Sequence, residues 1–144
     1  MHKHIKTEVI INAAKEKVWT LLTNFESYPL WNPFIVAIEG QLKQGARLKV
    51  KIKSQGKTMS FKPVVQNCKP LYSFTWMGQL FVKGVFDGYH YFEIEEIKTD
   101  QIKFTQGEKF SGLLSNYIFN KIGVETKNNF IRMNDALKQL SEQH

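Results

Sequence analysis

Residues 113–140 have the sequence LLSNYIFNKIGVETKNNFIRMNDALKQL, the longest stretch of the chain with a helical repeat. Its apolar residues recur every three or four positions, which places them along one side of a helix. We therefore predict one C-terminal helix of about 28 residues, roughly 40 Å long. Gly123 inside it costs about 1 kcal/mol relative to alanine, so a bend or a close packing contact is expected there. The residues on the apolar side are Leu114, Ile118, Ile122, Thr126, Phe130, Met133, Leu137 and Leu140.

The segments before this helix alternate between apolar and polar residues, which is the period of a β-strand. In residues 47–53, RLKVKIK, the odd positions are basic and the even positions are apolar, so this strand has one wet and one dry face. Short Gly, Asn, Asp or Pro signals separate the segments, as in an antiparallel meander. The predicted strands span residues 3–11, 35–41, 46–54, 58–68, 72–78, 85–97 and 101–110.

A helical segment interrupts the strands after residue 11. Asn12 is a natural N-cap because its side chain can accept hydrogen bonds from the free amides of a first helical turn. One apolar stripe then predicts a helix to about Thr23, followed by a short helical turn at residues 26–28. Pro29 and Pro33 prevent a longer helix.

The order of these elements predicts an α+β fold in one domain that spans residues 1–144. A seven-stranded curved antiparallel sheet would wrap around the long C-terminal helix, with two short helices after the first strand. One helix cannot cover the inner face of so strongly curved a sheet, which leaves space between them. That space is the candidate binding site.

Composition limits the classes of function. The formal net charge is +7, but only two of the twenty basic residues are arginines, so nucleic-acid binding is not expected, whereas transient contact with an anionic membrane surface remains open. The apolar runs are too short to span a bilayer, which excludes stable membrane insertion. The single cysteine, Cys68, cannot form an internal disulfide, so we expect a cytoplasmic protein. The oligomeric state is not predicted.

Several short segments occur in an order that is typical of one superfamily. They are Ala14–Trp19 (AKEKVW), Phe25–Phe34 (FESYPLWNPF), Gly40 with Gly45–Leu48 (GARL), Phe86–Phe92 (FDGYHYF) and Glu108–Leu114 (EKFSGLL). Through them essentially the whole chain resembles the START-like SRPBCC superfamily, and within it the polyketide cyclase/dehydrase-like bacterial proteins. The resemblance implies a helix-grip fold with an internal cavity. That superfamily includes lipid and sterol carriers, cyclases of aromatic polyketides and members without known activity, so the fold alone does not settle function.

His90 and Glu108 are polar residues at inward positions of two neighbouring predicted strands. If the hairpin between these strands closes near residues 98–100, residue numbers that sum to 198 face each other, which pairs His90 with Glu108. A register with a sum of 200 would oppose Phe92 to Glu108 and leave His90 and Glu108 as diagonal neighbours. We expect the imidazole and the carboxylate within about 3 Å of each other, or joined by one water. Either the pair transfers protons, with His90 as general base and Glu108 orienting it, or it anchors the sheet or orients a ligand.

The other candidate site residues are inward-facing and, apart from Gln106, aromatic or aliphatic. Such residues suit a flat or ring-bearing ligand, but a packed core uses the same types. The candidate ligand-binding residues are Trp31, Met59, Phe61, Phe74, Trp76, Phe92, Phe104, Gln106, Phe110, Ile118 and Ile122, and Phe130 would line or fill the same space.

Residues 79–84 (QLFVKG) place three apolar residues in a connection next to glycines. This loop would either gate the cavity or pack on the C-terminal helix. No phosphate-binding loop, nucleophile elbow or histidine spacing for a metal occurs, so no cofactor and no metal are expected.

Three hypotheses for function remain open. The first is a carrier, sensor or chaperone for a small hydrophobic molecule, which is lipid-like or polycyclic. The second is a cyclase or dehydratase that uses His90 and Glu108. The third is a protein-interaction domain that acts through the basic strand at residues 47–53. A closed, wholly apolar cavity favours the first, a water-filled pocket with several converging polar groups favours the second, and a filled core favours the third.

Overall fold

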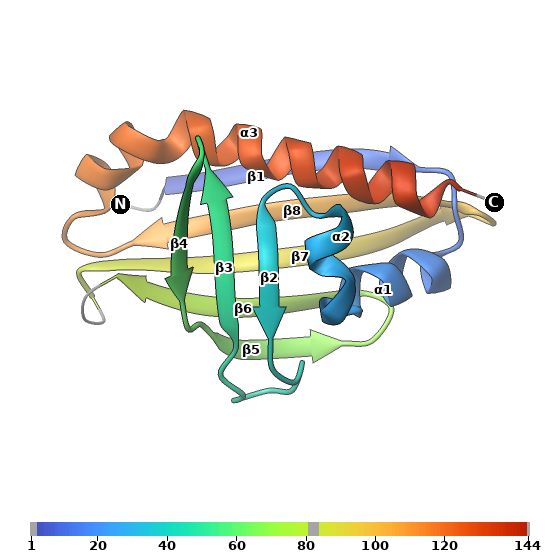
Figure 1. Ribbon diagram of the computed structural model, residues 1–144, viewed down its shortest axis with the longest axis horizontal. Helices are drawn as coiled ribbons and strands as arrows, with labels where there is room; N and C mark the ends of the chain where they lie inside the picture. Colours follow the sequence, from blue (N-terminus) through green and yellow to red (C-terminus); the bar gives the residue numbers. More distant parts are fainter. Residues whose placement is uncertain (1–2, 81–83, 144) are drawn as a thin grey trace.

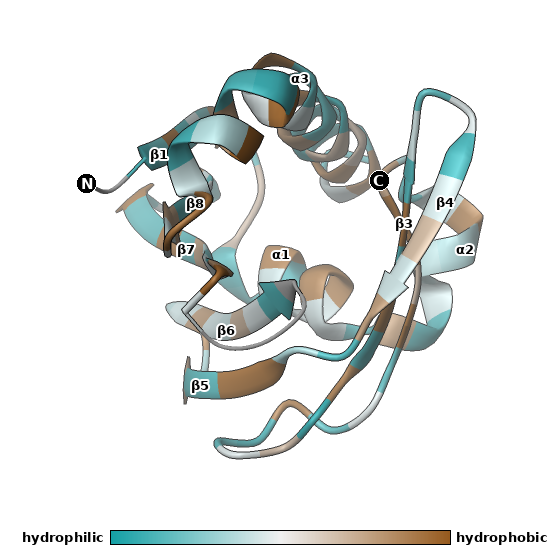
Figure 2. Cartoon of the chain, turned by 90° about the vertical axis from the view of Figure 1, so that its left-hand side faces the viewer, coloured by the Kyte–Doolittle hydropathy of each residue, from teal (hydrophilic) through white to brown (hydrophobic). Residues whose placement is uncertain are grey.

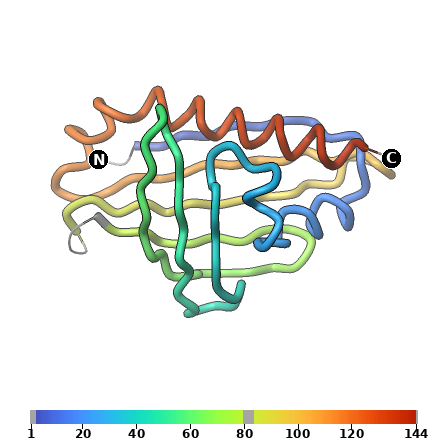
Figure 3. The backbone as a smooth tube through the Cα atoms, in the orientation of Figure 1, coloured from blue at the N-terminus to red at the C-terminus, as the bar shows by residue number. Residues whose placement is uncertain are grey.

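Two antiparallel sheets and one long helix enclose the interior, and the computed structural model describes residues 3–80 and 84–143 (Figure 1). The small sheet lies across the strands of the large one, in front of them in Figures 1 and 3. Within the described residues, the large sheet has the strand order β1 (Lys3–Ile11), β8 (Gln101–Ser111), β7 (Phe86–Lys98), β6 (Ser73–Leu80) and β5 (Val64–Lys69). The small sheet has the order β2 (Ile35–Glu39), β3 (Lys49–Ser54) and β4 (Lys57–Phe61).

The predicted strand at residues 58–68 is where the two sheets separate. β4 ends at Phe61 in the small sheet, and β5 begins at Val64 in the large sheet. Pro63 lies between them and has no backbone N–H with which to continue a ladder, so the strand is interrupted there. The prediction of one seven-stranded sheet is therefore corrected: the described part of the chain forms eight strands in two sheets.

Backbone hydrogen bonds still join the two sheets into one curved wall. The Leu48 N–H donates to the Pro63 carbonyl at 2.9 Å, and the Val65 N–H donates to the Ala46 carbonyl at 2.8 Å. These bonds bring the residues just before β3 against the start of β5. The small sheet is therefore held to the edge strand of the large one.

The alternation in β3 sorts its side chains as predicted. Leu48 and Val50 are fully buried, whereas Lys49 and Lys51 are exposed. The dry face of the small sheet thus points to the interior and its basic face points to solvent. Figure 2, coloured by hydropathy, shows the small sheet and the large sheet on different sides of the interior, with α3 (Ser115–Ser141) beside them.

The first helical segment starts later than its predicted N-cap. α1 (Lys15–Thr23) has Ala14 at its N-cap position, without a side-chain cap. The N-cap prediction for Asn12 is wrong because that residue is used in tertiary contacts: its N–H donates to Glu142 at 2.8 Å, and its side-chain oxygen accepts from Gln101 at 3.0 Å. The chain continues into a 3-10 turn, η1 (Phe25–Ser27), and α2 (Tyr28–Trp31).

The long C-terminal helix is confirmed, and α3 begins two residues later than predicted, at Ser115. Gly112 makes the turn before it with a φ of +111°, and a Cβ there would lie 2.6 Å from the Val85 carbonyl oxygen. A residue with a side chain would therefore be strained at this turn. Gly123 is buried within α3, and a Cβ there would lie 3.2 Å from the Phe119 ring, which is the close packing contact expected at this position.

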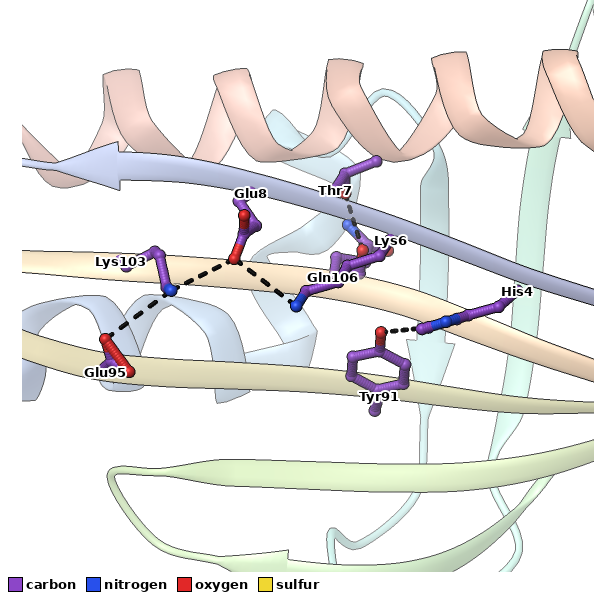
Figure 4. A network of polar contacts seen from close by, with 8 residues as sticks. All are labelled: His4, Lys6, Thr7, Glu8, Tyr91, Glu95, Lys103 and Gln106. Atoms are coloured by element: carbon purple, nitrogen blue, oxygen red, sulfur yellow. Dashed lines mark hydrogen bonds and ion pairs between the residues drawn. The ribbon is translucent and has the colours of Figure 1, made fainter.

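The outer face of the large sheet carries a polar network (Figure 4). Lys103 lies 3.3 Å from Glu8 and 3.8 Å from Glu95, so one lysine links carboxylates of neighbouring strands. The His4 imidazole contacts the Tyr91 hydroxyl at 2.6 Å, and burial raises the pKa of that tyrosine, assisted by nearby glutamates. This face lies on the opposite side of the sheet from the interior, and its carboxylates Glu8 and Glu95 are exposed, whereas Tyr91 is largely buried.

Candidate functional site

A cavity of about 350 Å³ lies between α3, the dry face of the small sheet and strands β6, β7 and β8. Each of these elements supplies part of the wall, so no single segment of sequence defines the cavity. Many of the predicted ligand-binding residues lie in this wall. They are Met59, Phe61, Trp76, Phe110, Ile118 and Ile122.

Other predicted ligand-binding residues lie away from the wall. Phe74, Phe92 and Phe104 are almost fully buried beyond it and pack on one another, with the Phe74 and Phe92 ring centroids 4.6 Å apart. Trp31 packs on Tyr28 at 5.2 Å and donates a hydrogen bond to Ser27, outside the cavity. Phe74, Phe92 and Phe104 therefore belong to the packed core at the closed end of the interior.

The structure adds wall residues that the sequence analysis did not name as site residues. Phe34, Ile35 and Phe86 line the cavity, together with Ile52 on the dry face of β3. The alternation of β3 already placed Ile52 inward. Phe34 and Ile35 follow Pro33, where the chain changes from helical to extended; Ile35 begins a predicted strand, but it was not named as a site residue.

His90 and Glu108 meet at the polar end of the cavity. The two residues face each other in the β7–β8 pairing, which confirms the predicted register. The distance from His90 Nδ1 to the Glu108 Oε1 atom is 3.5 Å, longer than the contact of about 3 Å that we expected. His90 is 3% exposed, and its ring stacks on Phe92 with centroids 4.6 Å apart.

The other nitrogen of His90 belongs to a buried hydrogen-bonded network that sequence reasoning missed. His90 Nε2 lies 2.9 Å from Gln106 Oε1, and Gln106 Nε2 donates to Asn134 Oδ1 at 2.8 Å. Asn134 Nδ2 donates to the Thr7 hydroxyl at 2.8 Å, and that hydroxyl donates to the Gln106 carbonyl at 2.8 Å. The sequence did contain a signal for Thr7 and Asn134: both are polar residues on the mostly apolar, inward sides of β1 and α3. A polar residue at such a position needs a hydrogen-bond partner.

Gln106 was predicted as a ligand-binding residue, but it is fully buried behind the wall and contacts His90 instead. It therefore supports a wall residue from the side opposite the cavity.

Gly88 explains how the Glu108 side chain fits. A Cβ at Gly88 would lie only 2.1 Å from Glu108 Oε2, so the carboxylate occupies the space that a side chain on β7 would fill. A glycine inside a strand often marks such a close approach. The absence of a side chain at Gly88 thus sets the position of the carboxylate at the cavity wall.

A second polar contact joins α3 to the small sheet. Asn129 lines the cavity, is 3% exposed and donates a hydrogen bond to the Ser54 hydroxyl at 3.0 Å. The Arg132 guanidinium donates to the Asn129 side-chain oxygen and to Glu125 at 2.9 Å. These contacts hold the first half of α3 over the cavity while leaving the apolar wall around them.

The predicted gate at residues 79–84 falls partly outside the described residues, because 81–83 are not among them. Gln79, at its start, lines the cavity. In the described part of the chain, no helix is both long enough and apolar enough to cross a bilayer. Residues 3–80 and 84–143 also contain no cluster of metal-ligating side chains.

A family model matches residues 2–132, which is most of the chain, and that family is described as polyketide cyclase/dehydrase and lipid transport. No sequence match is found among the curated proteins.

Solved structures with the same fold share little sequence with this chain. The Zhui aromatase/cyclase from Streptomyces sp. R1128 superposes with a TM-score of 0.81 at 12% identity, over 99% of this chain and 94% of that one. A START superfamily protein from Mycobacterium smegmatis gives a TM-score of 0.74 at 21% identity, over 99% of both chains. A point mutant of norcoclaurine synthase from Thalictrum flavum, solved with a transition-state analogue, superposes with a TM-score of 0.73 at 13% identity. The match covers 98% of this chain and 94% of that one. At these identities the similarity shows the fold alone.

Proposed function

Because the chain belongs to the family of polyketide cyclases, dehydrases and lipid-transport proteins, we propose that it binds a small, largely apolar molecule in the cavity beside α3. Its role would be that of a carrier, sensor or chaperone for that molecule. The observation that supports this proposal is an interior space of about 350 Å³, walled mostly by aromatic and aliphatic side chains. Ligand sites in proteins are typically concave and apolar, with few polar groups.

The energetics of the wall favour an apolar occupant. Burial of apolar surface contributes about 25 cal/mol per Å², so a ligand that buries roughly 200 Å² would gain about 5 kcal/mol before the cost of association. Polar side chains in the wall, among them His90, Glu108, Asn129 and Gln79, are outnumbered by aromatic and aliphatic ones. A cavity of this kind also favours the ligand-binding hypotheses over a protein-interaction domain, which we had tied to a filled core.

Native mass spectrometry of protein purified without detergent tests the proposal directly. We expect either a copurified small molecule or the uptake of one apolar fluorescent dye per chain. Ile118→Trp should fill the cavity and reduce dye affinity about tenfold or more, because Ile118 lies in the wall.

Val124→Trp on the same helix is the matched control, since Val124 is 80% exposed. Equal dye binding by both variants would place the dye outside the cavity and contradict the proposal.

A second candidate function rests on the His90–Glu108 pair. An imidazole and a carboxylate 3.5 Å apart at the wall of an apolar cavity provide a general base, His90, and a neighbouring charge, Glu108, that would stabilise the ring once it has gained a proton. Such a pair suits removal of a proton next to a carbonyl, the first step of an aldol cyclisation. Glu108→Gln should then lower turnover of a polyketide-like substrate at least tenfold with nearly unchanged binding. Unchanged turnover would contradict the catalytic role, and ligand binding would remain the only proposed function.

A further inference from the structure

In the hydrogen-bonded network behind His90, one backbone carbonyl oxygen determines which partner donates and which accepts in every bond. The Thr7 hydroxyl lies 2.8 Å from the Gln106 carbonyl oxygen, and a carbonyl oxygen only accepts hydrogen bonds. The single hydroxyl proton of Thr7 therefore points to that oxygen. Its lone pairs remain free to accept, and the group that donates to them is Asn134 Nδ2 at 2.8 Å.

The direction then passes along the chain of amides to the imidazole. With Asn134 Nδ2 bound to Thr7, Asn134 Oδ1 accepts from Gln106 Nε2 at 2.8 Å. Gln106 consequently presents its oxygen to His90 Nε2, at 2.9 Å. Because an amide oxygen cannot donate, the proton in that last bond belongs to His90 Nε2.

We propose that Thr7, Asn134 and Gln106 are positioning residues that hold His90 as the Nε2–H tautomer, so that its Nδ1 is an acceptor at the cavity wall. This inference rests on the proposed function and adds the ligand class: an apolar molecule that bears a hydrogen-bond donor, such as a hydroxyl group. Any proton that the ring gains or loses enters or leaves at Nδ1, on the cavity side.

The geometry around Nδ1 supports this ligand class. Nδ1 and Glu108 Oε1 are 3.5 Å apart, and a charge-assisted hydrogen bond between nitrogen and oxygen is about 2.7–2.9 Å long. The Glu108 side chain is 18% exposed and lines the cavity, so its carboxylate can be reached from there. Two acceptors thus lie side by side at the end of an apolar cavity. One ligand hydroxyl placed between them would donate to one of these two acceptors.

Nuclear magnetic resonance of ¹⁵N-histidine-labelled protein tests the tautomer without any ligand. In alkaline solution, where the imidazoles are neutral, His90 should show one Nε2–H signal that is protected from solvent exchange; His90→Gln assigns it. A proton on Nδ1 with an unprotonated Nε2 would overturn the inference.

Variants remote from the ring test whether the network sets this state. Thr7→Val removes the anchoring hydroxyl at the far end of the network, and it should lower the exchange protection of the Nε2 proton at least fivefold, whereas Thr7→Ser should retain it.

Thr75→Val is the matched control, because the Thr75 hydroxyl is buried and has no hydrogen-bond partner within the described residues. Equal protection in Thr7→Val and Thr75→Val would contradict a positioning role. If Thr7→Val does not fold, Gln106→Leu removes the acceptor itself and should abolish the protected signal.

Paired probes test the ligand class. We expect 2-naphthol to bind about tenfold more tightly than 2-methoxynaphthalene, which has the same ring system but no donor. Glu108→Leu together with His90→Phe should remove that preference, because neither new side chain can accept a hydrogen bond. Equal binding of both probes to the wild-type protein would refute the donor requirement while leaving the proposed function standing. Binding of neither probe or dye would refute the proposed function, and the tautomer measurement would still stand.

Discussion

The two halves of α3 share one apolar stripe in sequence but differ in what they bury. In the second half, Phe130, Met133 and Leu137 are completely buried against the large sheet and α1. In the first half, Ile122 on the same stripe is 39% exposed, and the residues buried there are small or polar. The stripe therefore determines which side of the helix faces inward, and the distance to the sheets determines whether that side meets a core or a cavity.

Polar contacts close the packed end of the molecule as well. Lys138 donates to the Ile10 carbonyl at 2.7 Å, and Glu142 accepts from the Asn12 N–H at 2.8 Å, so the last turns of α3 are tied to the end of β1. At the other end, Asn129 and Ser54 provide the corresponding contact to the small sheet. We infer that the packed half supplies most of the stability and that the cavity half tolerates change.

Truncation on each half of α3 gives the largest expected difference. Leu137→Ala should lower the free energy of unfolding by about 3 kcal/mol, because it opens a void in a closely packed core. Ile122→Ala should cost less than about 1 kcal/mol, because that side chain already borders open space. Urea unfolding followed by circular dichroism measures both. Similar losses for the two variants would mean that the halves do not differ in packing.

A pair of glycine variants tests the polar end of the cavity. Gly88→Ala would place a Cβ 2.1 Å from Glu108 Oε2 and displace the carboxylate, which is the end of a flexible side chain. We expect about a tenfold loss of affinity for 2-naphthol with little change in melting temperature.

Gly78→Ala is the matched control on β6, where a Cβ would lie 3.5 Å from the Phe61 ring, an ordinary contact. Equal affinity of both variants for 2-naphthol, or an unfolded Gly88→Ala variant, would contradict the claim that the position of the Glu108 carboxylate controls binding.

The smallest effect is expected at the closed end. The hydrogen bond from the Asn12 N–H, with help from Lys138, holds the pKa of Glu142 below its usual value. Because the folded-state pKa is lower, the contribution to stability is present above the unfolded-state pKa and is lost as pH falls through the folded-state value. Glu142→Gln should therefore lower stability by about 0.5 kcal/mol at neutral pH and converge with wild type in acid.

Chemical unfolding at several pH values measures the effect. Glu16→Gln is the control, because Glu16 is an exposed residue of α1. A difference between wild type and Glu142→Gln that persists unchanged in acid would contradict the linkage.

Local patterns in the sequence were sufficient for much of the fold. The period of residues 113–140 predicted α3, and the alternation in β3 predicted which of its faces is buried. Residue numbers placed His90 beside or diagonally across from Glu108, because a hairpin with a short closure permits few registers, and the structure has the first of these two arrangements. The division into two sheets was missed, although Pro63 was its visible signal within the predicted strand.

Partners between segments far apart in the chain could not be predicted in this way. Asn12 has the residue type of an N-cap, but contacts with Glu142 and Gln101 use it instead. Thr7, Gln106 and Asn134 come from three separate elements and meet only after the sheet and α3 have packed. No local period carries that information.

The sequence by itself determined most of the elements, their inward faces and a narrow choice of register for the β7–β8 hairpin, because periodicity and short closures act between near neighbours. Only the tertiary structure decided which inward residues form core and which form cavity wall. Trp76 lines the cavity while Phe74, two residues earlier on the same face of β6, is buried beyond it. Both are aromatic and inward-facing. What separates them is the distance from each position on the sheet to α3 and the small sheet, which the packing of whole elements sets.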